Sequence, residues 1–163
     1  MNLVKPCLLA TALLALAPVA SAAQLSANIN VQLTVQNFCT FSAAAAGLTF
    51  TPVTGNINTP IKSSTSLNVN CNQGAAYKIG LSDGAHALSG QRRLAGPSNQ
   101  YVNYDLFRDS DTGPAWGALN TADQFEGTGA NGAQSITVYG TVPATQSVGA
   151  GSYTDIVTAT IEY

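Results

Sequence analysis

The side chains that most often do chemistry are few in this sequence and lie far apart. Its single histidine, His86, is the only candidate general base, and it lies in the stretch "SDGAHALSG". A serine hydrolase needs a nucleophile, a histidine base and an orienting acid, and no G-x-S-x-G elbow or other nucleophile motif accompanies this histidine. We therefore interpret His86 as a solvent-exposed loop residue and expect the protein not to be an enzyme.

The acidic side chains do not form a recognisable site either. Asp109 and Asp111 have the D-x-D-x-G spacing of a calcium loop, but the third ligand position is Gly113 and the bidentate glutamate of an EF-hand is missing. A hairpin turn that uses Asp and Gly for its backbone angles explains the motif better. Nothing places a pair of carboxylates at the separation that glycoside hydrolysis needs. The residues considered for such a pair are Asp105, Asp109, Asp123 and Glu126. We expect no metal and no cofactor.

Residues 1–23 have the pattern of a secretory signal peptide. Lys5 is followed by an apolar run from Leu8 to Ala17 and then by small residues up to Ala23. The run is about half of the roughly 20 residues that a membrane-spanning helix needs. We expect cleavage after Ala22 or Ala23, and an exported protein without a membrane span.

Two cysteines, Cys39 and Cys71, remain once the signal peptide and its Cys7 are removed. An even pair in an exported protein predicts a structural disulfide. A zinc site would need further Cys, His or carboxylate ligands at short spacing. Charged side chains are scarce, with six basic and eight acidic residues in the whole chain. No basic patch indicates a nucleic acid or an anionic membrane as partner, so the low charge favours a surface that meets other proteins.

Residues 25–36 alternate between apolar and polar side chains without an exception, which predicts a half-buried strand. Shorter alternating stretches, separated by turn residues, lie at 66–71, 77–82, 102–106, 136–142 and 157–163. The glycine-rich intervals 84–100 and 117–132 are interpreted as crossing loops or irregular hairpins. The sequence therefore predicts one all-β domain, a sandwich with Greek-key topology.

The two ends of this pattern suggest an exchange between molecules. The last alternating stretch ends with the sequence itself, so a seven-stranded immunoglobulin-like sandwich would lack its final strand. An open edge over an apolar core is an aggregation hazard, and residues 25–36 supply a strand ahead of Cys39. This N-terminal strand either pairs within its own domain or completes the sheet of a neighbouring molecule. The pattern alone leaves both open.

Several pieces of the sequence match a known family in their order and spacing. They are Cys39, "STSLNVNCNQGAAYKIGLSDG" from Ser64, "RRLAG" from Arg92, "YVNYDLFRDS" from Tyr101, Trp116-Gly117, and "VYGTVPATQSVGAGSYTDIVTATIEY" at the C-terminal end. On these residues the chain resembles the spore coat protein U domain family, which includes the major pilins of archaic (Csu-type) chaperone–usher pili. The resemblance covers nearly all of the chain after the signal peptide.

This resemblance implies an incomplete immunoglobulin-like sandwich that lacks its final strand and is completed by donor-strand complementation. A periplasmic chaperone lends a strand beside the final strand, and at the outer-membrane usher the N-terminal segment of the next subunit replaces it. Carried onto this chain, the donor segment is residues 24–34, ahead of a pilin-type domain at 35–163. The donor side chains would be Leu25, Ala27, Ile29, Val31 and Leu33. The acceptor groove, which the chaperone also contacts, would be flanked by Val157, Ala159, Ile161 and Tyr163.

The function expected on this basis is structural. We expect a subunit of a cell-surface pilus (fimbrium), exported through the periplasm, that polymerises with identical or homologous subunits and supports surface attachment and biofilm formation. One alternative is a monomeric secreted spore-coat or envelope protein that completes its own sandwich. Another is a binding module for calcium or carbohydrate that uses the loop 109–113 with Tyr101, Tyr104 and Trp116, although these aromatics are better explained as core packing.

Overall fold

The computed structural model describes residues 21–42 and 46–163, and residues 35–163 form one compact unit. Its strands are β1 (Cys39–Phe41), β2 (Ile61–Cys71), β3 (Ala76–Leu81), β4 (Arg93–Ala95), β5 (Tyr101–Asn103), β6 (Asp105–Phe107), β7 (Phe125–Thr128), β8 (Gly132–Val142) and β9 (Ala159–Glu162). A single 3₁₀ turn, η1 (Pro97–Asn99), is the helical element of the described residues. The predicted all-β class is confirmed. No helix in this part of the chain is long and apolar enough to cross a membrane.

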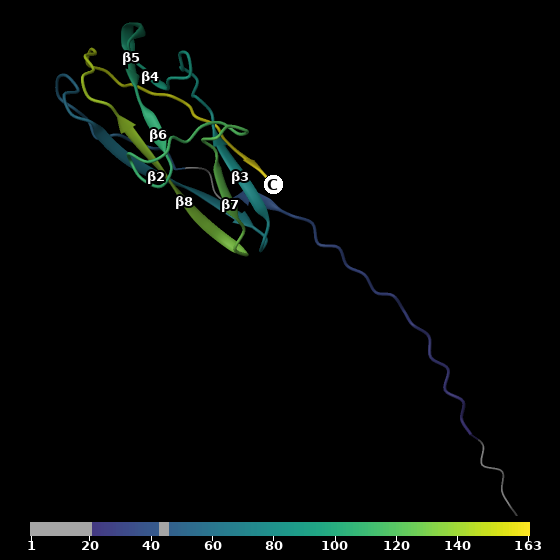
Figure 1. Ribbon diagram of the computed structural model, residues 1–163. Coiled ribbons are helices and arrows are strands. Elements are labelled where there is room, and N and C mark those ends of the chain that lie inside the picture. The colour runs from purple at the N-terminus through teal and green to yellow at the C-terminus, as the bar shows by residue number, and fades with distance from the viewer. Residues whose placement is uncertain (1–20, 43–45) are drawn as a thin grey trace, which may run out of the picture. The chain divides into compact units, whose positions relative to one another are not determined.

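The first sheet is built around the two longest strands, in the order β1-β2-β8-β6. β2 and β8 pair antiparallel over their whole length, from Ile61↔Val142 to Cys71↔Gly132, and Figure 1 shows them as the long central pair. Every second residue is buried from Leu67 to the end of β2 and from Ile136 to the end of β8, as the period-2 pattern predicts, and the alternate residues before them are partly buried. On β8 these are Ile136, Val138 and Val142, with Gly140 between them.

The second sheet packs its own apolar face over the first, in the order β7-β3-β9. β3 supplies the centre of its core face with Tyr77, Ile79 and Leu81, which are all buried. A small two-stranded sheet, β4-β5, lies at one end of the fold (Figure 1). Trp116 is fully buried, and its indole N–H donates a hydrogen bond to the Ile79 carbonyl (2.9 Å).

The predicted disulfide is present. Cys39 and Cys71 are direct register partners on β1 and β2, and their sulfurs are bonded. The bridge is covered by the core, because both cysteines are buried. It therefore ties the short edge strand β1 to the long strand beside it.

Some of the predicted elements differ from those observed. The predicted strand 102–106 is split into β5 and β6 at Tyr104, because β5 pairs with β4 whereas β6 pairs with β8. The predicted loops contain β4 and β7. Residues 25–36 form no strand, since none of the described strands pairs with them, and Figure 1 accordingly draws no arrow there. Most of the predicted signal peptide, residues 1–20, lies outside the described residues.

Candidate functional site

The edge strand β9 has a hydrogen-bonding partner on one side only. It pairs with β3 from Lys78↔Glu162 to Leu81↔Ala159, and within the described residues no strand pairs with its other side. The N–H of Ser82 donates to the carbonyl of Thr158 (2.9 Å), which fixes the alternation along the ladder. In an antiparallel pair, the backbone N–H and C=O groups of every second residue point toward the partner strand, and those of the residues between them point away from it. Because the Thr158 carbonyl points toward Ser82, the backbone groups of Ala159 and Ile161 point away from β3, toward the free edge. β9 thus presents a template for one more strand.

An apolar groove of about 340 Å³ opens between the two sheets beside this edge. One wall comes from the first sheet and the other from β3 and the chain that leads into β9; the lining includes Leu67, Leu106, Val138, Leu81, Val157 and Ala159. An apolar cavity of about 150 Å³ is already large enough to bind benzene, and close-packed interiors rarely keep voids of this size. The groove is therefore suited to apolar side chains supplied from outside the domain.

The segment 46–50 forms the other rim of the groove without belonging to a strand. It is held by hydroxyls on the core face of β2. Ser63 Oγ donates to the Thr49 carbonyl (2.6 Å), and Thr65 Oγ1 donates to the Ala46 carbonyl (2.8 Å). Leu48 and Phe50 fill the space that Gly140 leaves on β8, where an added Cβ would lie 2.9 Å from a Leu48 methyl carbon.

A buried polar cluster lies at the end of the groove that precedes β9. Tyr104 Oη donates to Asp155 Oδ2 (2.7 Å), while Asp155 Oδ1 accepts from the His86 backbone N–H (3.2 Å) and lies 3.0 Å from His86 Nδ1. Burial, joined by the hydrogen bond to Asp155, raises the pKa of Tyr104. Burial alone would raise the pKa of Asp155 as well, but its hydrogen bonds from Tyr104, His86 and the Ile156 backbone lower that pKa overall.

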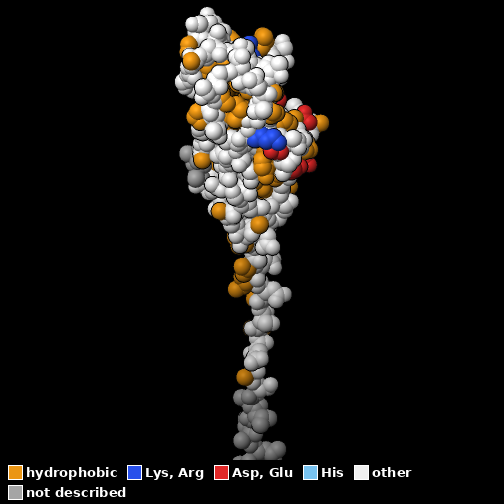
Figure 2. Space-filling view, turned by 90° about the vertical axis from the view of Figure 1, so that its left-hand side faces the viewer, with side chains coloured by type: hydrophobic (Ala, Val, Ile, Leu, Met, Phe, Trp, Pro, Cys, Tyr) orange, Lys and Arg blue, Asp and Glu red, His pale blue; other side chains and the backbone are white. Residues whose placement is uncertain are grey.

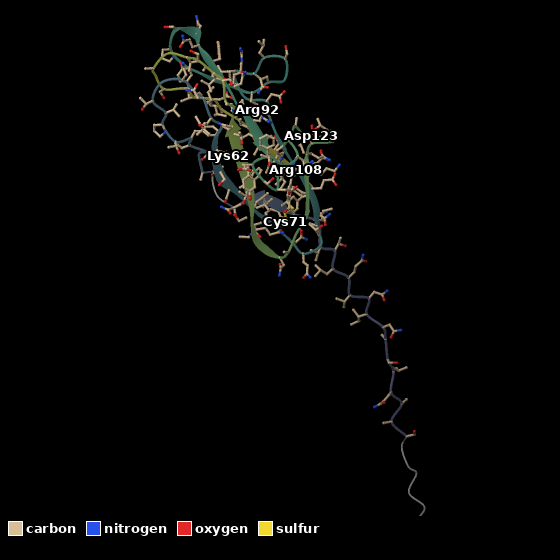
Figure 3. All side chains as sticks on the ribbon, turned by 60° about the vertical axis from the view of Figure 1, so that its left-hand side comes forward. Lys62, Cys71, Arg92, Arg108 and Asp123 are labelled. Atoms are coloured by element: carbon tan, nitrogen blue, oxygen red, sulfur yellow. A yellow bond between two sulfur atoms is a disulfide. The ribbon has the colours of Figure 1, made fainter. Side chains whose placement is uncertain are left out.

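Arg92 anchors the neighbouring end of β3. It is 7% exposed, lies among the strands (Figure 3), and donates to the carbonyls of Ser82 (2.9 Å), Leu81 (3.0 Å) and Trp116 (2.9 Å). Burial lowers the pKa of Arg92, and nearby Tyr104 and the carboxylates of Asp83, Asp105 and Asp155 oppose that shift. The Arg92 guanidinium thus makes its hydrogen bonds to backbone carbonyls within the fold.

The N-terminal segment, taken by itself, exposes the apolar side chains of its alternating pattern. Leu25 is 99% exposed and Ile29 is 85% exposed, and Val31 and Leu33 are similarly open to solvent. The domain's own fixed structure begins near Gln36, because Asn72 Nδ2 donates to the Gln36 carbonyl (3.2 Å) and Asn72 Oδ1 accepts from the Phe38 N–H (2.9 Å). Residues 24–34 precede these anchors.

The structure places the predicted acceptor residues in two locations. Val157 and Ala159 line the groove, and Ile161 packs half-buried against the core. Tyr163 lies beyond the end of β9 and lines a different hollow, with Tyr77 of β3 and Gly127 of β7. Two of the four predicted acceptor residues, Val157 and Ala159, therefore line the groove, whereas Ile161 and Tyr163 do not.

Two further sequence interpretations can be compared with the structure. His86 does lie in a loop, but its side chain is only 39% exposed and contacts buried Asp155, so describing it as a simple solvent-exposed residue was incomplete. The hydroxyl that contacts this His–Asp pair is that of Tyr104, and it bonds to Asp155 rather than to the imidazole ring. Asp109 and Gly113 form a turn in which the Gly113 N–H donates to the Ser110 carbonyl (3.1 Å) and Asp109 has φ +66°.

Comparison with known proteins places this geometry in a family. The model of the Spore Coat Protein U domain matches residues 25–160. The chain belongs to the Spore Coat Protein U domain family. A curated relative, "Protein U" of Myxococcus xanthus, is 32% identical over 169 residues, which cover 94% of this chain and 93% of the relative.

Solved structures support the fold of this family member. One chain of the CsuC–CsuE chaperone–tip adhesion subunit pre-assembly complex, from the archaic chaperone–usher Csu pili of Acinetobacter baumannii, matches with a TM-score of 0.58 at 23% identity. The match covers 80% of this chain and 41% of that chain. A chaperone–tip adhesin complex of CFA/I fimbriae is more distant, with a TM-score of 0.40 at 12% identity over 77% of this chain and 40% of that one. The first match confirms the predicted immunoglobulin-like sandwich, and we base no argument on the second.

Proposed function

We propose that this chain is a structural subunit of a chaperone–usher pilus that polymerises by donor-strand exchange. The observation that carries the proposal is the unpaired edge of β9 beside an open apolar groove. A strand inserted there would gain main-chain hydrogen bonds from β9, and its alternate side chains would enter the groove. Residues 24–34 have the required pattern, with Leu25, Ile29 and Val31 exposed.

The low surface charge supports an assembled role. Figure 2 shows a face with few charged side chains and hydrophobic ones at several places. Since a strand supplied by one molecule to the next makes a head-to-tail contact that does not close, it produces a fibre. On this proposal the partners are identical or homologous subunits, a periplasmic chaperone that occupies the groove first, and an outer-membrane usher. The chain is exported through the periplasm to the cell surface, where the pilus supports attachment and biofilm formation.

A chaperone partner is supported by the matched complex, which joins a chaperone to a pilus tip adhesion subunit before assembly. The proposed donor side chains are Leu25, Ala27, Ile29, Val31 and Leu33. Burying the four larger ones at roughly 1.5–3 kcal/mol each gives a gross gain on the order of 10 kcal/mol per contact. The net gain is smaller, because ordering the donor segment and joining two molecules cost free energy.

The test is assembly by a chain that lacks the donor side chains. Purified wild-type protein should form a ladder in unboiled denaturing gels, and deletion of residues 25–31 should abolish the ladder while the remaining domain still binds a cognate chaperone. Unchanged assembly after the deletion would refute the donor role. A wild-type protein that stays monomeric at high concentration would contradict the pilus proposal itself.

A second candidate is a monomeric coat protein whose own N-terminal segment fills its own groove. It is favoured by the relative "Protein U", which the chain matches over 93% of that relative's length, and by the family's spore-coat description. It predicts a monomer in which residues 24–34 are protected from proteolysis. The pilus subunit predicts that the same residues are protected only in polymers or with an added groove partner.

A further inference from the structure

The carboxylate of Asp155 is buried in the segment that leads into β9. Its side chain is 1% exposed, although it lines the polar end of the groove. It accepts hydrogen bonds from Tyr104 Oη (2.7 Å) and from the His86 N–H (3.2 Å), which lie 51 and 69 residues earlier in the chain. One side chain thus connects the C-terminal segment to two other parts of the fold.

The backbone on both sides of Asp155 is fixed to the same region. Thr154 and Ala95 exchange two backbone hydrogen bonds (2.9 and 2.8 Å), and the Ile156 carbonyl accepts from the Ala85 N–H (3.0 Å). Two residues farther on, the Thr158 N–H donates to Ser82 Oγ (2.9 Å). Val157, which lines the groove and is partly buried, is carried on this stretch. The position of one groove wall is therefore set by residues 154–158.

The chain opposite is shaped to accept this carboxylate. Gly84 has φ +90°, and a Cβ there would lie 2.0 Å from Asp155 Oδ2, so this position has no room for another residue. Gly84 also follows Ser82, whose carbonyl accepts a hydrogen bond from buried Arg92. The loop 82–86 is thus built around the Asp155 side chain and is itself held by Arg92.

The groove wall formed by residues 154–158 must keep its conformation before a donor strand binds. β9 has a ladder on one side only, and Val157 and Ala159, which line the groove, are only partly buried against the core. Edge segments with few apolar contacts open locally at low free energy, and an unfilled apolar groove favours collapse of its walls. The partial core packing of this wall is therefore supplemented by the polar contacts of residues 154–158 until a strand arrives.

We propose that Asp155 is a positioning residue that holds this wall in its strand-accepting conformation while the groove is empty, through hydrogen bonds to Tyr104 and His86. The inference rests on the proposed donor-strand function and assigns a role to a residue that does not belong to the apolar acceptor surface. Once a donor strand is bound, its ladder with β9 and its buried side chains fix the same wall. Asp155 consequently matters for strand uptake and much less for strand retention.

The experiment measures uptake and release separately. The full chain carrying Ile29→Asp, which weakens its own donor segment, is mixed with a fluorescent synthetic peptide of residues 24–35. Association and dissociation rates are followed by anisotropy for this parent and for Asp155→Ala, Asp155→Asn and Asp123→Ala made in it. Asp123 is an exposed carboxylate and serves as the matched control (Figure 3).

We expect Asp155→Ala to slow uptake about tenfold or more, the factor that corresponds to losing net hydrogen bonds to a buried charged group. The release rate of bound peptide should stay within about twofold of the parent, because the occupied groove no longer depends on Asp155. Asp155→Asn should restore most of the uptake rate, since its amide can accept from the His86 N–H and donate to Tyr104 Oη. Asp123→Ala should behave as the parent does.

The following results would overturn the proposal. Equal uptake by Asp155→Ala and the parent, both folded by near-ultraviolet circular dichroism, would overturn the positioning role and leave the donor-strand function standing. Faster release in step with slower uptake would show general destabilisation and would also overturn it. If Asp155→Ala does not fold, failure of Asp155→Asn to recover uptake despite a native spectrum decides against the proposal. Absence of any uptake by the parent would refute the donor-strand function as well.

Discussion

Replacing Ile29 by alanine should weaken assembly without affecting the subunit itself. Ile29 precedes the compact unit 35–163, so its truncation leaves the core of that unit unchanged. Exposed substitutions of this kind change the free energy of unfolding by about 0.5 kcal/mol or less. Inside a groove the same truncation loses roughly 2–3 kcal/mol of apolar burial, which corresponds to roughly 30- to 150-fold in the affinity of each contact.

The matched control is Asn30→Ala, one residue farther along and on the other face of the alternating pattern. A strand that inserts its odd-numbered side chains turns Asn30 to the outside, so this variant should assemble as the wild type does. Polymer yield in unboiled denaturing gels and the thermal midpoint of the monomeric fraction are measured for both variants. Equal losses from the two substitutions, or a lower monomer midpoint for Ile29→Ala alone, would refute the reasoning.

Three further predictions concern the domain that accepts the strand. Removing the disulfide by Cys39→Ala with Cys71→Ala should lower the free energy of unfolding by roughly 3–4 kcal/mol for a closed loop of this length, measured by denaturant titration against the oxidised wild type. Gly140→Leu should displace Leu48 from β8 and raise the proteolytic sensitivity of the segment 46–50, while unchanged cleavage would show that the segment does not depend on this contact. The lowered pKa of Asp155 means that its contribution to stability is present above about pH 4 and is lost as the pH falls through the native pKa, so Asp155→Asn should flatten the pH dependence of the thermal midpoint below about pH 4.

Strands with a regular apolar alternation could be predicted from the sequence. The core faces of β3 and β8 follow directly from Tyr77-x-Ile79-x-Leu81 and from the alternation that begins at Ile136. The first half of β2 was missed because its core-facing positions include Ser63 and Thr65. Their hydroxyls bond to carbonyls of the segment 46–50, a tertiary contact that no local pattern reveals.

The polar end of the groove was missed for a related reason. Asp155, Tyr104 and His86 are separated by many residues, and each is unremarkable in its own stretch of sequence. Only folding brings them within hydrogen-bond distance. One local signal existed in the glycine of "SDGAH", because a glycine beside a loop histidine indicates either a turn or a close approach by another part of the chain. Here it is both.

The disulfide has a mechanical consequence. Tension that enters the domain through the residues before Cys39 reaches β1, a strand of only three residues that could be peeled from the sheet one hydrogen bond at a time. The bond to Cys71 diverts that tension into β2. β2 is paired with β8 along all of its 11 residues, so the load is shared among many hydrogen bonds in shear. A pull on the N-terminal segment is therefore passed to β2 and β8, the longest pair of strands among the described residues, and not to β1 alone.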